Sequence, residues 1–160
     1  LMLSAAFTGG IIAHFEDALA AQVALTAFIP MLMDTGGNCG SQSSVTVIRG
    51  LSLGQVGFSD WLRVLWKEMR ISALCAAALA AVNFLRLLVM SHVGMGIALT
   101  VSLTLAVTVV TSDLIGSALP IIAKRLGFDP AVMASPLITT VVDATSLLTY
   151  FWLASWLLGL

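Results

Sequence analysis

The chain has 160 residues, of which 59% are hydrophobic and only 9% are charged, and its net charge is −1. A soluble domain carries about 25% charged residues, so a chain this apolar cannot cover itself with polar surface and needs lipid around it. The lack of a basic field also argues against nucleic acid as a partner. These proportions predict a single all-α, polytopic membrane domain.

Polar residues divide the chain into five predicted membrane-spanning helices. They cover approximately residues 1–13, 19–48, 61–90, 95–123 and 130–160. The first would be about 20 Å long as a helix, against a hydrocarbon core of about 30 Å. We therefore expect this helix to be truncated at its start, with a further segment upstream of it.

The basic residues predict the orientation of these spans. Six of the seven fall on one side: Arg49, Arg63, Lys67, Arg70, Lys124 and Arg125. Lys and Arg gather in cytoplasmic loops, so this side is predicted to be cytoplasmic and the C-terminus to lie outside. The expected location is the cell (inner) membrane, crossed several times.

The last predicted span carries an acidic residue far from either end. Asp143 lies 13 residues after Pro130, which is about 20 Å along a helix, and no Lys or Arg occurs at that depth in any span. Hydroxyl residues share its helical face: Ser135, Thr139, Ser146 and Tyr150. Intramembrane carboxylates normally face a bundle interior or water. The pattern favours a cation site; the alternative is a protonated acid that hydrogen-bonds a neighbouring helix.

The second predicted span has a polar face and a stripe of small residues. The polar side chains lie at helical spacing: Asp34, Asn38, Ser41 and Gln42. The small residues follow at steps of four: Gly36, Gly40 and Ser44. Small residues let another backbone approach closely, so a packing seam is the alternative reading. Pro30 and the glycine pair weaken the helix and can expose carbonyls, which would suit a hard cation together with the acid and the amides.

The two polar faces are predicted to lie at similar depth. Asn38 is 11 residues from Arg49, at the cytoplasmic end of its span, which corresponds to about 17 Å of helix. Asp143 stands about 20 Å in by the same measure. If the two helices are neighbours, their polar faces meet around one pore.

A third intramembrane acid, Asp113, follows several hydroxyl residues in the predicted span 95–123. They are Thr104, Thr108, Thr111 and Ser112. Because a hydroxyl-rich helix can satisfy one acid internally, both a structural and a functional role are left open.

Two stretches of the sequence resemble MgtE-type magnesium channels and their eukaryotic solute-carrier relatives. Residues Pro30–Gln42 match the signature P-x₅-GGN-x-G-x-Q, and the segment from Leu126 to Asp143 resembles the start of the last transmembrane helix of that family. The resemblance covers essentially the whole chain. Two departures affect the site: Asp113 stands where some relatives have a neutral amide, and Ser135 where some have Asn.

The resemblance implies a homodimer with one pore between the second and fifth helices of both protomers. It implies a Mg²⁺ site around Asp143, with Asn38 and Thr139 in the same region, and it matches Glu68 and Asp129 to acids that join in gating at the cytoplasmic mouth. It also implies an upstream cytosolic region that senses Mg²⁺ through paired CBS domains and is missing from this chain.

The predicted function is therefore conduction of Mg²⁺, with Mn²⁺, Co²⁺ or Ca²⁺ as further candidates. Mg²⁺ dehydrates reluctantly, so Asp143 of two protomers would hold a largely hydrated ion. The main alternative is a proton- or sodium-coupled carrier with Asp143 or Asp113 as a relay. An enzyme is not expected, because the GxGD, HExxH and GxSG motifs are not present in the sequence. A purely structural subunit does not explain the uncompensated carboxylates.

Overall fold

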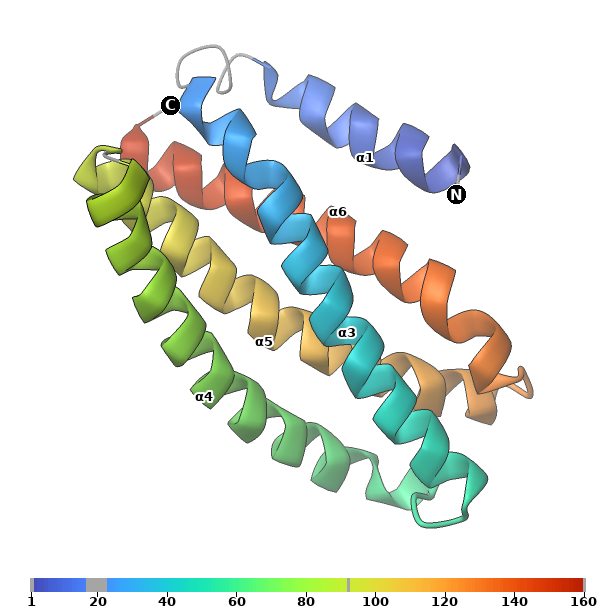
Figure 1. The fold of residues 1–160 in the computed structure, drawn as a ribbon. Helices are drawn as coiled ribbons and strands as arrows, with labels where there is room; N and C mark the ends of the chain where they lie inside the picture. The colour runs from blue at the N-terminus through green and yellow to red at the C-terminus, as the bar shows by residue number, and fades with distance from the viewer. Residues whose placement is uncertain (1, 17–22, 92, 160) are drawn as a thin grey trace.

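The computed structural model describes residues 2–16, 23–91 and 93–159, without the side chains of residues 3, 4, 58 and 132–135. Within these ranges every regular element is a helix, as predicted (Figure 1). The α-helices are α1 (Met2–His14), α3 (Ile29–Ser52), α4 (Trp61–Arg86), α5 (Met95–Arg125) and α6 (Pro130–Leu158). Shorter elements are the 3₁₀ turns η1 (Val23–Phe28) and η2 (Phe58–Asp60) and the π-helical turn η3 (Leu87–Ser91).

The helix boundaries follow the predicted spans with one main difference. The predicted second span begins at residue 19; residues 19–22 lie outside the described residues, and the chain from residue 23 forms η1 before α3 begins at Ile29. Pro30 stands in the first turn of α3, where its missing N–H costs nothing. The helix then runs unbroken to Ser52, four residues beyond the predicted end. The helix therefore keeps its regular form through Pro30 and the glycines, and the weakening expected of them is not seen in α3.

Within the described ranges, three helical segments are long and apolar enough to cross a membrane: Trp61–Ser91, Met95–Arg125 and Pro136–Leu158. The five-span prediction is thus met for three spans by length and composition. In α1 the apolar segment Ala5–His14 is shorter than a span. In α3 the length is sufficient at 24 residues, but its Asp, Asn, Gln, Ser and Gly residues lower the hydropathy.

Helix α5 lies at the centre of the bundle. It packs against α3, α4 and α6, while α3 also packs against α6 and α1 lies along α6 (Figure 1). The buried side of α5 includes Val101, Leu105 and Val109, which join Leu147 and Phe151 of α6 in the main hydrophobic core. Many large apolar side chains of α4 are exposed, as expected for a helix whose outer face meets lipid.

The basic end of the bundle is held together by a side-chain contact. Lys124 Nζ, in the last turn of α5, donates to the backbone carbonyl of Leu51 in the last turn of α3, at 2.9 Å. A cation near the C-terminal carbonyls of a helix is favourable. The ends of α3 and α5 that carry Arg49, Lys124 and Arg125 are therefore neighbours, which agrees with the one-sided distribution of basic residues in the sequence.

Candidate functional site

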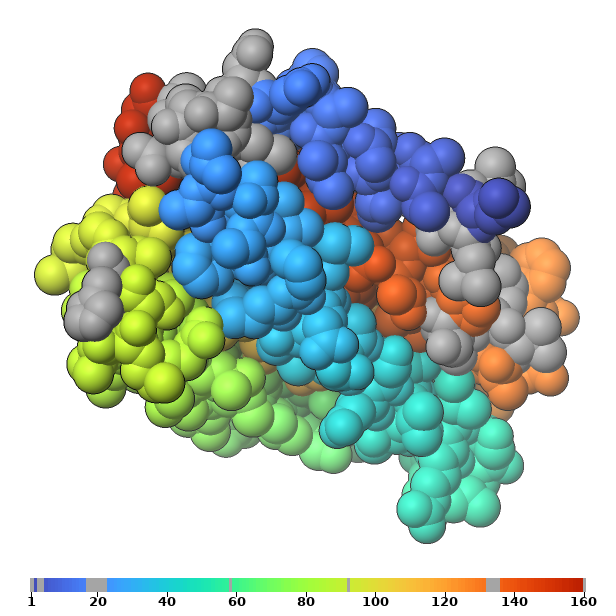
Figure 2. Space-filling view, turned by 45° about the horizontal axis from the view of Figure 1, so that its top comes forward, coloured from blue at the N-terminus to red at the C-terminus, as the bar shows by residue number. Residues whose placement is uncertain are grey.

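A polar pocket of about 240 Å³ lies between α3 and α6. It is lined by Met33, Asp34, Gly37, Asn38, Ser41, Thr139 and Asp143. The structure thus brings together three of the five site residues predicted from the sequence: Asn38, Thr139 and Asp143. Figure 2 shows α3 and the middle of α6 side by side on the face that it presents.

The small-residue stripe of α3 creates this proximity. A Cβ atom on Gly36 would come within 2.9 Å of Val142 Cγ1, and one on Gly40 within 3.2 Å of Ile138 and Val142. The backbone of α3 therefore touches side chains of α6 directly, as predicted for small residues at this spacing. Gly37 and Asn38 lie on a different side of α3 from these two contact points, and there they line the pocket together with Thr139 and Asp143.

Asp143 has a carboxylate oxygen without a partner. Its Oδ1 atom is fully enclosed and accepts no hydrogen bond from any described residue. The side chain as a whole is half-buried, and no Lys or Arg of the described residues forms an ion pair with it. An enclosed carboxylate oxygen without a donor is costly, and a cation in the pocket beside Asp143 would offset part of this cost.

The α3 side of the pocket is exposed. Asp34 and Asn38 are exposed while lining the pocket, and Gln42, one turn further on, is exposed outside it. In a membrane such side chains avoid hydrocarbon and face water or another protein surface. The open side of the pocket is therefore a surface that lipid alone would cover poorly.

The groups around the pocket are oxygen donors. Two carboxylates, one amide and the hydroxyls of Ser41 and Thr139 line it, and hard divalent cations prefer such ligands. Among the described residues no group of three or more His, Cys, Asp or Glu side chains gathers closely enough to form a metal cage. With Asp34 and Asp143 as the two carboxylates of the lining, an ion held here would keep part of its water shell.

The other two predicted site residues lie elsewhere. Glu68 is buried on α4 at 8% exposure and does not line the pocket. Asp129 is exposed and caps α6, because its Oδ1 accepts from the backbone N–H of Ala131 at 2.9 Å. The Asp129-Pro130 pair is a sequence signal of this cap, since Pro is typical of the first helical position.

The hydroxyls near Asp113 do not satisfy its carboxylate in the described part of the structure. Ser117 donates to the backbone carbonyl of Asp113 instead, at 2.8 Å. The Thr108 and Ser112 hydroxyls are buried without a hydrogen-bond partner among the described residues. Hydrogen bonds from neighbouring hydroxyls to the Asp113 carboxylate, which the sequence left open as a structural role, are thus not seen among the described residues.

Tyr150 continues the polar face of α6 but serves another purpose. Its hydroxyl donates to the carbonyl of Leu25 in η1 at 2.9 Å, and both residues are fully buried. Of the other members of the predicted face, Ser146 donates to Val142 O at 2.7 Å, and the side chain of Ser135 lies outside the described residues. On this face of α6, Thr139 and Asp143 therefore line the pocket, whereas Tyr150 anchors the helix to η1.

An all-α bundle with apolar spans and an acidic pocket between two helices belongs to the class of polytopic helical membrane proteins. Residues 29–153 match the MgtE family model, described as a divalent cation transporter, and the chain belongs to this family. The Magnesium transporter MgtE of Thermus thermophilus is 37% identical over 159 residues, covering 99% of this chain and 35% of that protein.

Two further relatives carry the same name. The Magnesium transporter MgtE of Bacillus subtilis is 37% identical over 159 residues, covering 97% of this chain and 34% of that protein. That of Enterococcus faecalis is 32% identical over 149 residues, covering 92% and 32%. The chain thus spans about a third of the length of the curated relatives that it matches, and the predicted family membership is confirmed.

Proposed function

We propose that this chain forms the membrane part of a Mg²⁺-selective channel, with the pocket between α3 and α6 as its ion site. The observation that carries the proposal is the enclosed, unpartnered Oδ1 of Asp143 in a pocket lined by oxygen donors. Membership of a divalent cation transporter family supports it, as do the relatives named as magnesium transporters.

The size of the pocket suits a hydrated ion. About six waters at roughly 30 Å³ each occupy about 180 Å³, which is less than the pocket volume of about 240 Å³. Mg²⁺ prefers octahedral coordination and gives up its waters reluctantly. Asp143, Asn38 and Thr139 would therefore bind the ion through its waters, with Asp143 supplying the charge.

The open, polar side of the pocket supports a homodimer. A second copy that meets the face carrying Asp34 and Asn38 would shield these side chains from lipid and close a pore between the two protomers. Two Asp143 carboxylates facing one pore repel each other when it is empty, and a divalent cation relieves this repulsion better than a monovalent one. In this arrangement α1 and α3 also cross the membrane, the C-terminus lies outside, and Glu68 and Asp129 stand near the cytoplasmic mouth.

The proposal is tested by Mg²⁺ flux into proteoliposomes that contain the full-length protein. Asp143→Ala should reduce flux at least 100-fold while the protein stays folded and dimeric, because the ion loses the charged group of its site. Glu16→Ala removes an exposed acid just after the end of α1 and is the matched control. Normal flux in Asp143→Ala would overturn the site assignment.

A coupled carrier is the alternative mechanism, and the same vesicles separate the two. A channel conducts Mg²⁺ at a rate that does not change when a proton or sodium gradient of either direction is imposed at constant membrane potential. Flux that follows such a gradient would favour the carrier. Competition by Mn²⁺, Co²⁺ and Ca²⁺ in the same assay measures the selectivity.

A further inference from the structure

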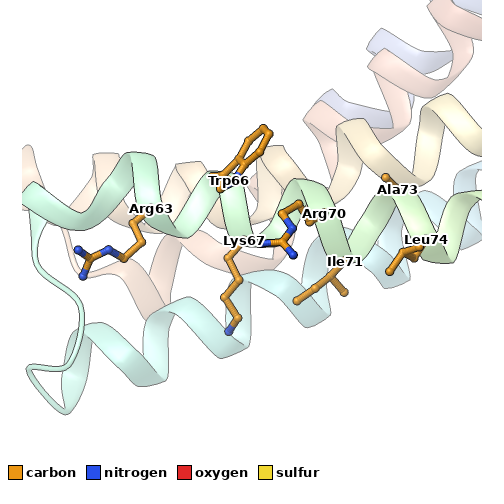
Figure 3. A pocket seen from close by; sticks show the side chains of 7 residues that line it. All are labelled: Arg63, Trp66, Lys67, Arg70, Ile71, Ala73 and Leu74. Carbon is orange, nitrogen blue, oxygen red and sulfur yellow. The ribbon is translucent and has the colours of Figure 1, made fainter.

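An open groove of about 810 Å³ runs along the first half of α4 (Figure 3). It is lined by Arg63, Trp66, Lys67, Arg70, Ile71, Ala73 and Leu74. All seven of these described residues belong to α4, and the groove is open to the surface. All seven side chains are exposed, and none of them lines the proposed ion site.

The first part of the groove is strongly basic. Arg63, Lys67 and Arg70 are exposed, and in the described part of the structure none of them forms a hydrogen bond or an ion pair. They follow each other at steps of four and three residues, which places them on the same side of the helix. Among the described residues the lining contains no acid, and Glu68 lies on the buried side of α4, so no described side chain balances the three positive charges.

The second part of the groove is apolar. Ile71 and Leu74 follow the basic residues along the helix and are 44% and 75% exposed. In Figure 3 their side chains point to the same side of α4 as Lys67. Because α4 is long and apolar enough to cross a membrane, this part is expected to lie at the depth of the acyl chains.

Trp66 joins this groove to a second one. An apolar groove of about 640 Å³ between α4 and α5 is lined by Leu62, Leu65, Trp66, Met69, Leu114, Ile115 and Ala118. Trp66 thus lies at the edge of both. Tryptophan is enriched where hydrocarbon meets the headgroups, and long basic side chains beside it extend towards the headgroups.

We propose that this surface binds an anionic phospholipid. The phosphate lies among Arg63, Lys67 and Arg70, and the acyl chains pass Ile71 and Leu74 on one side of Trp66 and enter the apolar groove on the other. A lipid is the occupant that combines a negative head with apolar chains in the order in which the surface presents its charge and its apolar residues. Guanidinium and ammonium groups are suited to phosphate, and basic clusters at a membrane surface attract anionic lipids.

The test is lipid binding to the full-length protein in detergent, counted by native mass spectrometry with phosphatidylglycerol and phosphatidylcholine. Lys67→Gln/Arg70→Gln should weaken phosphatidylglycerol binding about 10-fold or more and leave phosphatidylcholine binding unchanged, because each cation near a phosphate contributes to the affinity. Arg49→Gln/Arg86→Gln removes the same charge outside the groove and should bind as the unaltered protein does.

Three results would overturn the proposal. Unchanged phosphatidylglycerol binding in a folded Lys67→Gln/Arg70→Gln variant would show that the groove is not the site. Displacement of the lipid by an equal concentration of inorganic phosphate would identify a site for free anions, and loss of self-association in the variant would identify a contact between copies. If the variant fails to fold, two other measurements replace it. The charge-conserving variant Lys67→Arg/Arg70→Lys should still bind phosphatidylglycerol. Binding of phosphatidylglycerol to the unaltered protein should fall as the salt concentration rises. The readout is independent of Mg²⁺ flux, so the two proposals fail separately.

Discussion

The backbone of Gly116 on α5 lies directly against the carbonyl of Gly40 on α3, so that a Cβ atom on Gly116 would overlap that carbonyl. One helical turn later, Pro120 has no N–H to offer to the carbonyl of Gly116. Beside this contact the hydroxyls of Ser43 and Ser117 share a hydrogen bond. Helix α3 is therefore held close to α5 on one side and to α6 on the other, and this position places its polar face at the pocket.

The tight side of α3 should tolerate a methyl group far less well than its pocket side. On Gly36 a Cβ would lie 2.9 Å from both Thr108 Cγ2 and Val142 Cγ1, whereas on Gly37 its nearest neighbour would be Thr139 Cγ2 at 3.9 Å. We expect Gly36→Ala to destabilise the protein by about 1–3 kcal/mol through overpacking. Gly37→Ala should be neutral or stabilise by up to about 1 kcal/mol through helix propensity. Thermal unfolding in one detergent measures both, and equal melting temperatures would contradict the packing described.

The buried hydrogen bond from Tyr150 to Leu25 should contribute to stability. Tyr150→Phe keeps the ring but leaves the Leu25 carbonyl without its 2.9 Å donor in a fully buried position. We expect a loss of about 1–3 kcal/mol in the free energy of unfolding. Trp152→Phe, at a 66% exposed position of the same helix, is the control and should change stability little. A Tyr150→Phe variant as stable as this control would show that the bond is not made.

Asp129 offers a way to separate capping from charge. Asp129→Ala removes the acceptor for the Ala131 N–H and should cost about 1 kcal/mol of stability, whereas Asp129→Asn keeps an equally good cap without the charge. Denaturation in detergent should therefore rank Asp129→Asn with the unaltered protein. If the charge takes part in gating, Asp129→Asn alters the Mg²⁺ dependence of flux at unchanged stability. An Asp129→Asn variant as unstable as Asp129→Ala would refute the capping role.

Asp34 should tune ion binding without being essential. It lines the pocket together with Asp143, but it lies at the exposed, open side of the pocket, whereas the Oδ1 atom of Asp143 is enclosed. We expect Asp34→Asn to raise the Mg²⁺ concentration for half-maximal flux about 3- to 10-fold, in contrast to the near-complete loss expected for Asp143→Ala. Concentration-dependent flux in proteoliposomes measures this change. Complete loss of flux in a folded Asp34→Asn variant would instead make Asp34 the central acid.

Much of the helical layout could be read from the sequence. Apolar runs separated by short polar segments predicted helices that start at Trp61, Met95 and Pro130, and the structure has helices with these starts. Local periodicity also placed Thr139 and Asp143 on one side of α6, and it placed the small residues of α3 together on one side of that helix. These features depend on residues within a few turns of each other, and helix geometry alone relates them.

Only the tertiary structure decided which faces meet. Asn38 and Asp143 are more than a hundred residues apart in sequence, and they share a pocket because the glycines of α3 let α5 and α6 approach its backbone. Glu68 and Asp129 look like equivalent acids in the sequence, yet one is buried between helices and the other caps α6. The sequence determined each helix and its faces, because these are set by local spacing. The pocket required the packing, because complementary shape between distant segments is not a local property.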